Sequence, residues 1–95
     1  PAEGEYFVYA ILKSIDAGNN TITVEQLINE PNEKEINPEV TLGQDCQVVR
    51  IVLEQATEKE AITEINLSDI GINNEIGIIF KSDNTARAII FQEIK

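Results

Sequence analysis

The chain of 95 residues contains no histidine, no tryptophan and no methionine, and it has a single cysteine. Without a second cysteine no internal disulfide can form, and a structural zinc site, which draws on cysteine and histidine, is all but excluded. The Cys–His pair of nucleophilic catalysis cannot be built either. Cys46 lies in an apolar segment, so we expect it to be a small buried hydrophobic side chain of a strand.

Long apolar segments and basic residues are also scarce. The longest apolar run, Tyr6–Leu12, has seven residues, whereas a membrane-spanning helix needs about twenty. Seven basic residues stand against seventeen acidic ones, which gives a net charge of −10. Nucleic acids and anionic membranes repel such a chain, so we expect no nucleic-acid binding and no membrane insertion by this segment. A cationic partner or a divalent metal ion suits the charge, which also favours a soluble monomer.

Catalytic motifs are missing as well. The sequence has no glycine-rich phosphate loop and no Gly-x-Ser-x-Gly elbow. Glycoside hydrolysis would need two carboxylates at a set separation, and seventeen acidic residues supply such a pair by chance alone. We therefore expect a protein that is not an enzyme, with no catalytic residue and no cofactor.

The residues that are present indicate an all-β chain. Asp16–Asn20 and Ser82–Asn84 are polar turns between apolar, β-branched runs, which is the pattern of β-hairpins. A bulge is expected just before Ile15. The pattern predicts five long strands, or six with a short one that is broken by Gly43; the expected strands cover residues 7–15, 21–27, 39–42, 46–53, 76–80 and 86–94. The continuous apolar character of 46–53 is typical of a strand with both faces covered, or of one that crosses the middle of a closed sheet.

The segment 54–64 has two interpretations. Thr57-Glu58-Lys59-Glu60 matches a helical capping box, with apolar residues at helical spacing behind it. The same residues also fit a turn between a strand that ends at Leu53 and one that starts near Ala61. We favour the turn because 63–67 alternates between polar and apolar residues. The connection 68–75 has room for one short helical or 3₁₀ turn.

We expect one β-barrel domain over residues 1–95, with a tail at 1–5 and a solvated acidic loop at 29–39. The expected fold is a small antiparallel, five- to six-stranded barrel, since closure removes the exposed edges of an isoleucine-rich sheet. The chain opens at Pro1 without an initiator methionine, and we expect it to be a piece of a longer product.

The order of the motifs resembles a family of small OB-like β-barrel domains of unknown function from bacterial secreted and surface proteins, including lipoproteins. The resemblance rests on Ala10–Asp16, Ile22-Thr23-Val24, Leu67-Ser68-Asp69-Ile70 and the closing hairpin, with Ala10 in place of the family's glycine. It implies a barrel in an extracytoplasmic or cell-surface setting and supplies no active site.

Two classes of function follow from these observations. The first is a non-enzymatic binding or structural module of a larger protein, for which Tyr6, Phe7 and Tyr9 are candidate anchors. The second is an accessory domain that binds Ca²⁺ or a small ligand, if the barrel brings both polar turns to one rim. The candidate ligands of such a site are Asp16, Asn19, Asn20, Asp83 and Asn84. A nucleic-acid-binding barrel would instead need a basic stripe, which only Lys13, Arg50, Lys81 and Arg87 could form.

Overall fold

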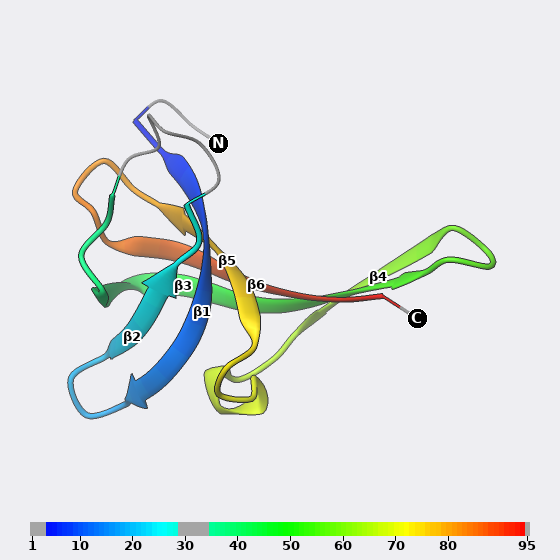
Figure 1. The fold of residues 1–95 in the computed structure, drawn as a ribbon, viewed down its shortest axis with the longest axis horizontal. Helices are drawn as coiled ribbons and strands as arrows, with labels where there is room; N and C mark the ends of the chain where they lie inside the picture. Colours follow the sequence, from blue (N-terminus) through cyan, green and yellow to red (C-terminus); the bar gives the residue numbers. More distant parts are fainter. Residues whose placement is uncertain (1–3, 29–34, 95) are drawn as a thin grey trace.

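The computed structural model describes residues 4–28 and 35–94, and it is an all-β fold (Figure 1). The strands are β1 (Tyr6–Asp16), β2 (Thr21–Gln26), β3 (Glu39–Glu54), β4 (Lys59–Glu64), β5 (Glu75–Phe80) and β6 (Ala86–Ile94). A 3₁₀ turn, η1 (Leu67–Asp69), lies between β4 and β5. Within the described residues no helix is long and apolar enough to cross a membrane.

Five of the strands close into an OB-like barrel. The sheet runs in the order β2-β1-β5-β6-β3-β4, and an additional pairing of β2 with β3 closes it. All pairings are antiparallel except that of β3 with β6, which is parallel. The expected barrel is therefore confirmed, with one parallel pair in a sheet that was predicted to be antiparallel throughout. Parallel neighbours cannot be joined by a tight turn, and here β4, η1 and β5 lie in the connection between them.

The core fills the barrel with side chains that alternate along each strand. Leu12, Ile78 and Ile89 have no exposed surface, and Ile70, which follows η1, is 2% exposed. The buried hydrophobic residues are Val8, Ala10, Leu12, Ile22, Val24, Val40, Ile70, Ile76, Ile78, Phe80, Ala86, Ala88 and Ile89. Among the described residues, none of the buried core side chains comes from β4, and the long β3 supplies only Val40.

The turn predictions agree with the backbone. The strand pairing of β1 and β2 shifts between Leu12 and Ser14, which is the predicted bulge before Ile15. Asn20 and Asn84 have φ angles of 55° and 68°, a left-handed region that asparagine tolerates better than most residues. The turn interpretation of 54–64 is confirmed, because β3 ends at Glu54 and β4 begins only five residues later. The helical alternative is wrong.

The predicted break at Gly43 is also wrong, because 39–42 and 46–53 form one continuous strand. The pairing of β3 with β6 shifts between Leu42 and Gln47, so the strand bends at this point and continues. A Cβ atom at Gly43 would lie 3.1 Å from the carbonyl oxygen of Ala86, so glycine allows the two strands to approach closely. Residues 1–3 of the predicted tail and 29–34 of the predicted acidic loop lie outside the described residues.

Candidate interaction surface

An arm of sheet leaves the barrel on one side (Figure 1). It has three strands, because β3 pairs with β4 and with β6 along it. The arm consists of residues 50–54 of β3, the whole of β4, and residues 91–94 of β6. Ile51 pairs with Ile62 on one side and with Gln92 on the other. All six residues of β4 are exposed. The arm is thus a single layer of sheet without a second layer over either face in the described chain.

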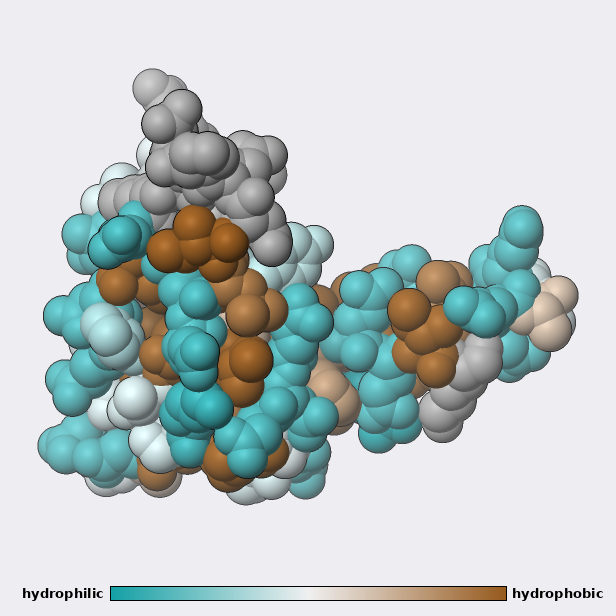
Figure 2. Space-filling model, viewed as in Figure 1, coloured by the Kyte–Doolittle hydropathy of each residue, from teal (hydrophilic) through white to brown (hydrophobic). Residues whose placement is uncertain are grey.

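One face of the arm continues the outer face of the barrel. Tyr9 pairs with Gly77, Gly77 pairs with Ile90, and Ile90 pairs with Val49 of β3. Directly paired residues of a sheet point to the same side, so the outward side chains form one surface from β1 to β4. We call this surface the apolar face. Its large hydrophobic side chains that are exposed or line a groove are Phe7, Tyr9, Ile51, Ile62, Ile90 and Ile94. Apolar surface is visible on both the barrel and the arm in Figure 2.

Phe7, Tyr9, Ile62 and Ile94 are exposed. Ile51 and Ile90 are half-buried. Tyr9 is 49% exposed, Ile94 is 60% exposed and Ile62 is 64% exposed. Scattered exposed hydrophobic residues are ordinary, but a contiguous set on one face is typical of an interaction site. The apolar face is such a set.

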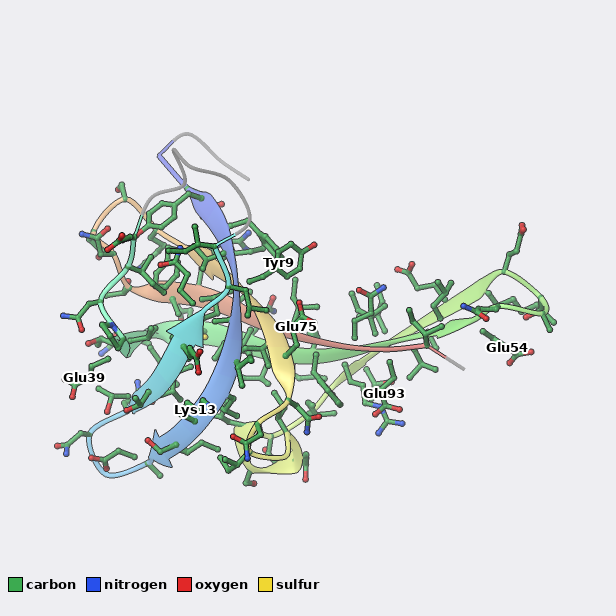
Figure 3. The ribbon with its side chains drawn as sticks, in the orientation of Figure 1. Tyr9, Lys13, Glu39, Glu54, Glu75 and Glu93 are labelled. Atoms are coloured by element: carbon green, nitrogen blue, oxygen red, sulfur yellow. The ribbon has the colours of Figure 1, made fainter. Side chains whose placement is uncertain are left out.

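A groove of about 370 Å³ lies where the arm meets the barrel. Phe7, Tyr9 and Ile51 line it together with Ile90 and Ile94, and the carboxylates of Glu60 and Glu75 border it. Figure 3 shows Tyr9 and Glu75 on the side of the barrel that faces the arm, and Glu54 near the tip of the arm. The groove is therefore lined by apolar and acidic side chains together.

Two of the three predicted aromatic anchors lie on the apolar face. Phe7 and Tyr9 form an edge-to-face pair with their ring centroids 4.7 Å apart. The Phe7 ring covers Gly77, where an added Cβ atom would lie 2.5 Å from its Cζ atom. Tyr6 has a different place, because its ring stacks on Phe80 at 5.0 Å and its hydroxyl donates a 2.7 Å hydrogen bond to Asn84. Tyr6 supports the barrel end and is not an exposed anchor.

The two polar turns lie at opposite ends of β1, so the barrel does not bring them to one rim. Asp16 is the last residue of β1, whereas Tyr6, the first residue, binds Asn84 of the other turn. The first turn borders a groove beside Cys46, and the second borders a groove beside Tyr6. The five candidate ligands therefore do not form a joint site.

In each turn, the carboxylate of the aspartate already accepts hydrogen bonds from a neighbouring residue of the chain. Asp16 accepts hydrogen bonds from the backbone and the side-chain nitrogen atoms of Asn19. Asp83 accepts bonds from the backbone N–H and the hydroxyl of Thr85, at 3.0 and 2.6 Å. These bonds from Thr85 lower the pKa of the Asp83 carboxyl below its ordinary value. Both sets of contacts are those of Asx-type turns.

Most of the candidate basic residues are engaged by glutamates. Lys13 pairs with Glu25 at 3.5 Å, and Arg50 pairs with Glu93 at 3.3 Å. Arg87 forms an ion pair with Glu5. These three pairs neutralise cationic charge on β1, on the arm and on β6 separately, so they give no support to a nucleic-acid interface.

Cys46 is half-buried against the core. Burial raises the pKa of its thiol, which keeps the sulfur protonated and a poor nucleophile at neutral pH. Its interpretation as a hydrophobic side chain of a strand agrees with this position.

No family model, no curated protein and no solved structure matches the chain. The geometry of the fold is therefore the basis for the proposed function. Phe7 and Tyr9 were expected from the sequence as anchors, whereas Ile51, Ile62 and Ile94 were not. The available signal was the apolar run 46–53. The sequence pattern of this segment is that of a covered strand, whereas in the fold residues 48–53 are only half-buried.

Proposed function

We propose that this chain is a non-enzymatic binding module that recognises another protein through the apolar face. The observation that carries the proposal is the arm, whose central strand has the sequence of a covered strand and whose outer strand is fully exposed. Burying an exposed isoleucine removes apolar surface from water and stabilises a complex by about 1.5–3 kcal/mol for a complete burial. Ile62 and Ile94 are exposed and offer this gain only when a partner covers them.

The composition of the apolar face suits a protein partner. Tyrosine in an apolar, water-excluding setting is a common hot spot of protein interfaces, and Tyr9 lies beside the groove with Phe7 against it. Glu60 and Glu75 border the same groove. Charges at the margin of an interface select and orient the partner more than they add to affinity. The expected partner surface is therefore apolar with basic margins.

We further propose that the chain belongs to an extracytoplasmic protein. By its resemblance to the OB-like domains of bacterial secreted and surface proteins, the chain serves as one module of a larger bacterial extracytoplasmic protein, with the apolar face available for its contacts. Fractionation of cells that express the full-length protein tests this part, because a protein confined to the cytoplasm would contradict it.

Site-specific photo-crosslinking in the native host tests the binding surface. A photoreactive phenylalanine analogue at Tyr9 or Ile62 should cross-link to one protein partner. The matched control is Thr23, an exposed residue on the outer side of β2 and away from the apolar face, where no cross-link to that partner is expected. The double variant Tyr9→Ser and Ile94→Ser should abolish copurification of the partner. Equal cross-linking from Thr23, or none from either position on the apolar face, would overturn the proposal.

A further inference from the structure

The outer edge of the arm is an open sheet edge. β4 is the last strand of the sheet, and within the described chain it pairs with β3 alone. An open edge presents backbone N–H and C=O groups in a row, which is a template for another strand. Natural proteins commonly block such edges with proline or with charged side chains. β4 has no proline, and its charged residues Glu60 and Glu64 disfavour an acidic strand but not a basic one.

The register identifies which residues face the open edge. The Ile65 N–H donates to the Val48 carbonyl, so these two residues form a hydrogen-bonded pair of the antiparallel ladder. Such pairs alternate along the ladder. The backbone groups of Lys59, Ala61 and Thr63 therefore face β3, and those of the residues between them face outward.

The outward backbone groups belong to Glu60, Ile62 and Glu64. Their side chains lie on the apolar face, because Ile62 pairs with Ile51 and the glutamates lie two residues to either side of it. An added antiparallel strand would thus pair its backbone with these three residues and set its own side chains directly opposite theirs. The edge presents the pattern acidic, apolar, acidic.

This pattern disfavours a second copy of the chain. In a two-fold antiparallel pairing centred on Ile62, Glu60 of one copy would lie opposite Glu64 of the other, and like charges directly opposite are destabilising. The net charge of −10 adds a general repulsion between copies. A strand with basic residues opposite both glutamates avoids the like-charge pairs and the repulsion between two acidic chains.

We propose that the outer edge of β4 binds an extended segment of the partner protein as an added antiparallel strand, with the pattern basic–x–apolar–x–basic opposite Glu60, Ile62 and Glu64. This inference rests on the proposed function and names the chemistry of the partner. Backbone hydrogen bonds supply the affinity of such strand addition, and the alternate side chains supply its specificity. The apolar residue of the segment covers Ile62 and extends the contact toward Ile51.

The experiment uses the ¹⁵N-labelled chain and two synthetic peptides as probes. The first, Thr-Lys-Thr-Ile-Thr-Lys-Thr, carries the proposed pattern, and the second has glutamate in place of both lysines. We expect the first peptide to bind at least about tenfold more tightly, because two opposite-charge pairs replace two like-charge pairs. Amide hydrogen exchange should slow at Glu60, Ile62 and Glu64, while Ala61 and Thr63 keep the protection that β3 already gives them.

Three variants make the test specific. Ile62→Pro removes the central outward N–H without removing a bond to β3 and should abolish binding of the lysine peptide. Glu60→Lys with Glu64→Lys should reverse the preference so that the glutamate peptide binds better. Glu58→Lys, which changes the charge of the turn next to β4, is the matched control and should keep the original preference. Slow exchange of Ile78 and Ile89 shows that each variant is folded.

The outcomes separate this inference from the proposed function. If Tyr9 cross-links to a partner but the lysine peptide does not bind, or binds without the alternating protection at β4, strand addition is wrong and the proposed function stands. If the wild-type chain sediments as a dimer that Ile62→Pro dissolves, the occupant of the edge is a second copy and the inference is overturned. Binding with reversal in the charge variant supports it.

Discussion

At the scale of single residues, the same side chain has different roles in the barrel and in the arm. Ile78 has no exposed surface, whereas Ile62 is 64% exposed. Ile78→Ala should lower the free energy of unfolding by about 2–5 kcal/mol, because it removes transfer energy and leaves a cavity. Ile62→Ala should change it by about 0.5 kcal/mol or less. Urea unfolding of the two variants measures both values. A comparable loss from Ile62→Ala would mean that the arm contributes to the core.

At the scale of elements, the sequence predicts the strands well because the alternation and the turn residues are local signals. The closing hairpin of β5 and β6 is an example, since Asp83 and Asn84 interrupt two apolar runs and Asn84 takes the positive φ that the turn needs. The extent of β3 is not a local property. Gly43 marks a break in the sequence, but the pairing partners on both sides carry the strand through it.

The arm could not be predicted from the sequence either, because its extent is not a local property of the chain. A continuous apolar run records that a strand is covered, but it does not say whether the cover comes from the same chain. Residues 49–53 pair with β4 on one side and with β6 on the other. Which residues of these strands extend beyond the barrel wall is determined by the topology of the whole sheet and not by the local sequence. The metal candidates failed to meet in space for a related reason, because two hairpins with similar turns can lie at opposite ends of one strand.

The arm should be separable from the barrel. Among the described residues 49–64, which include the β3 and β4 part of the arm, none is a core side chain or a hydrophobic side chain packed against the core. Phe91 of β6 does pack against the core and is kept in the variant below. Replacing residues 51–62 by Asn-Gly joins Arg50 to Thr63, which are directly paired, and this dipeptide favours a two-residue hairpin. We expect the free energy of unfolding to change by less than about 1 kcal/mol, while cross-linking from Tyr9 to the partner is lost. Loss of cooperative urea unfolding in this variant would contradict the division into barrel and arm.

At the scale of the whole molecule, salt should act on folding and on binding with opposite signs. The molecule measures 38 × 34 × 26 Å and carries a net charge of −10. The Debye length is about 30 Å at 0.01 M salt and about 10 Å at 0.1 M. At low salt the acidic residues therefore repel one another across the whole barrel, and added salt relieves this cost of the compact state. We expect the free energy of unfolding to rise when NaCl increases from about 0.01 to 0.2 M.

Over the same range, the affinity for the lysine peptide should fall several-fold, because the attraction of Glu60 and Glu64 and of the acidic surface is screened. A peptide with glutamine in place of both lysines isolates the backbone and apolar contributions, and its affinity should stay nearly constant. Fluorescence anisotropy at several salt concentrations measures both peptides. If both lost affinity equally, the salt would act on the arm and not on the charges. Salt should thus raise the free energy of unfolding and lower the affinity for the lysine peptide at the same time. Unfolding of the protein cannot explain this combination, so the loss of affinity must come from screening of the charges.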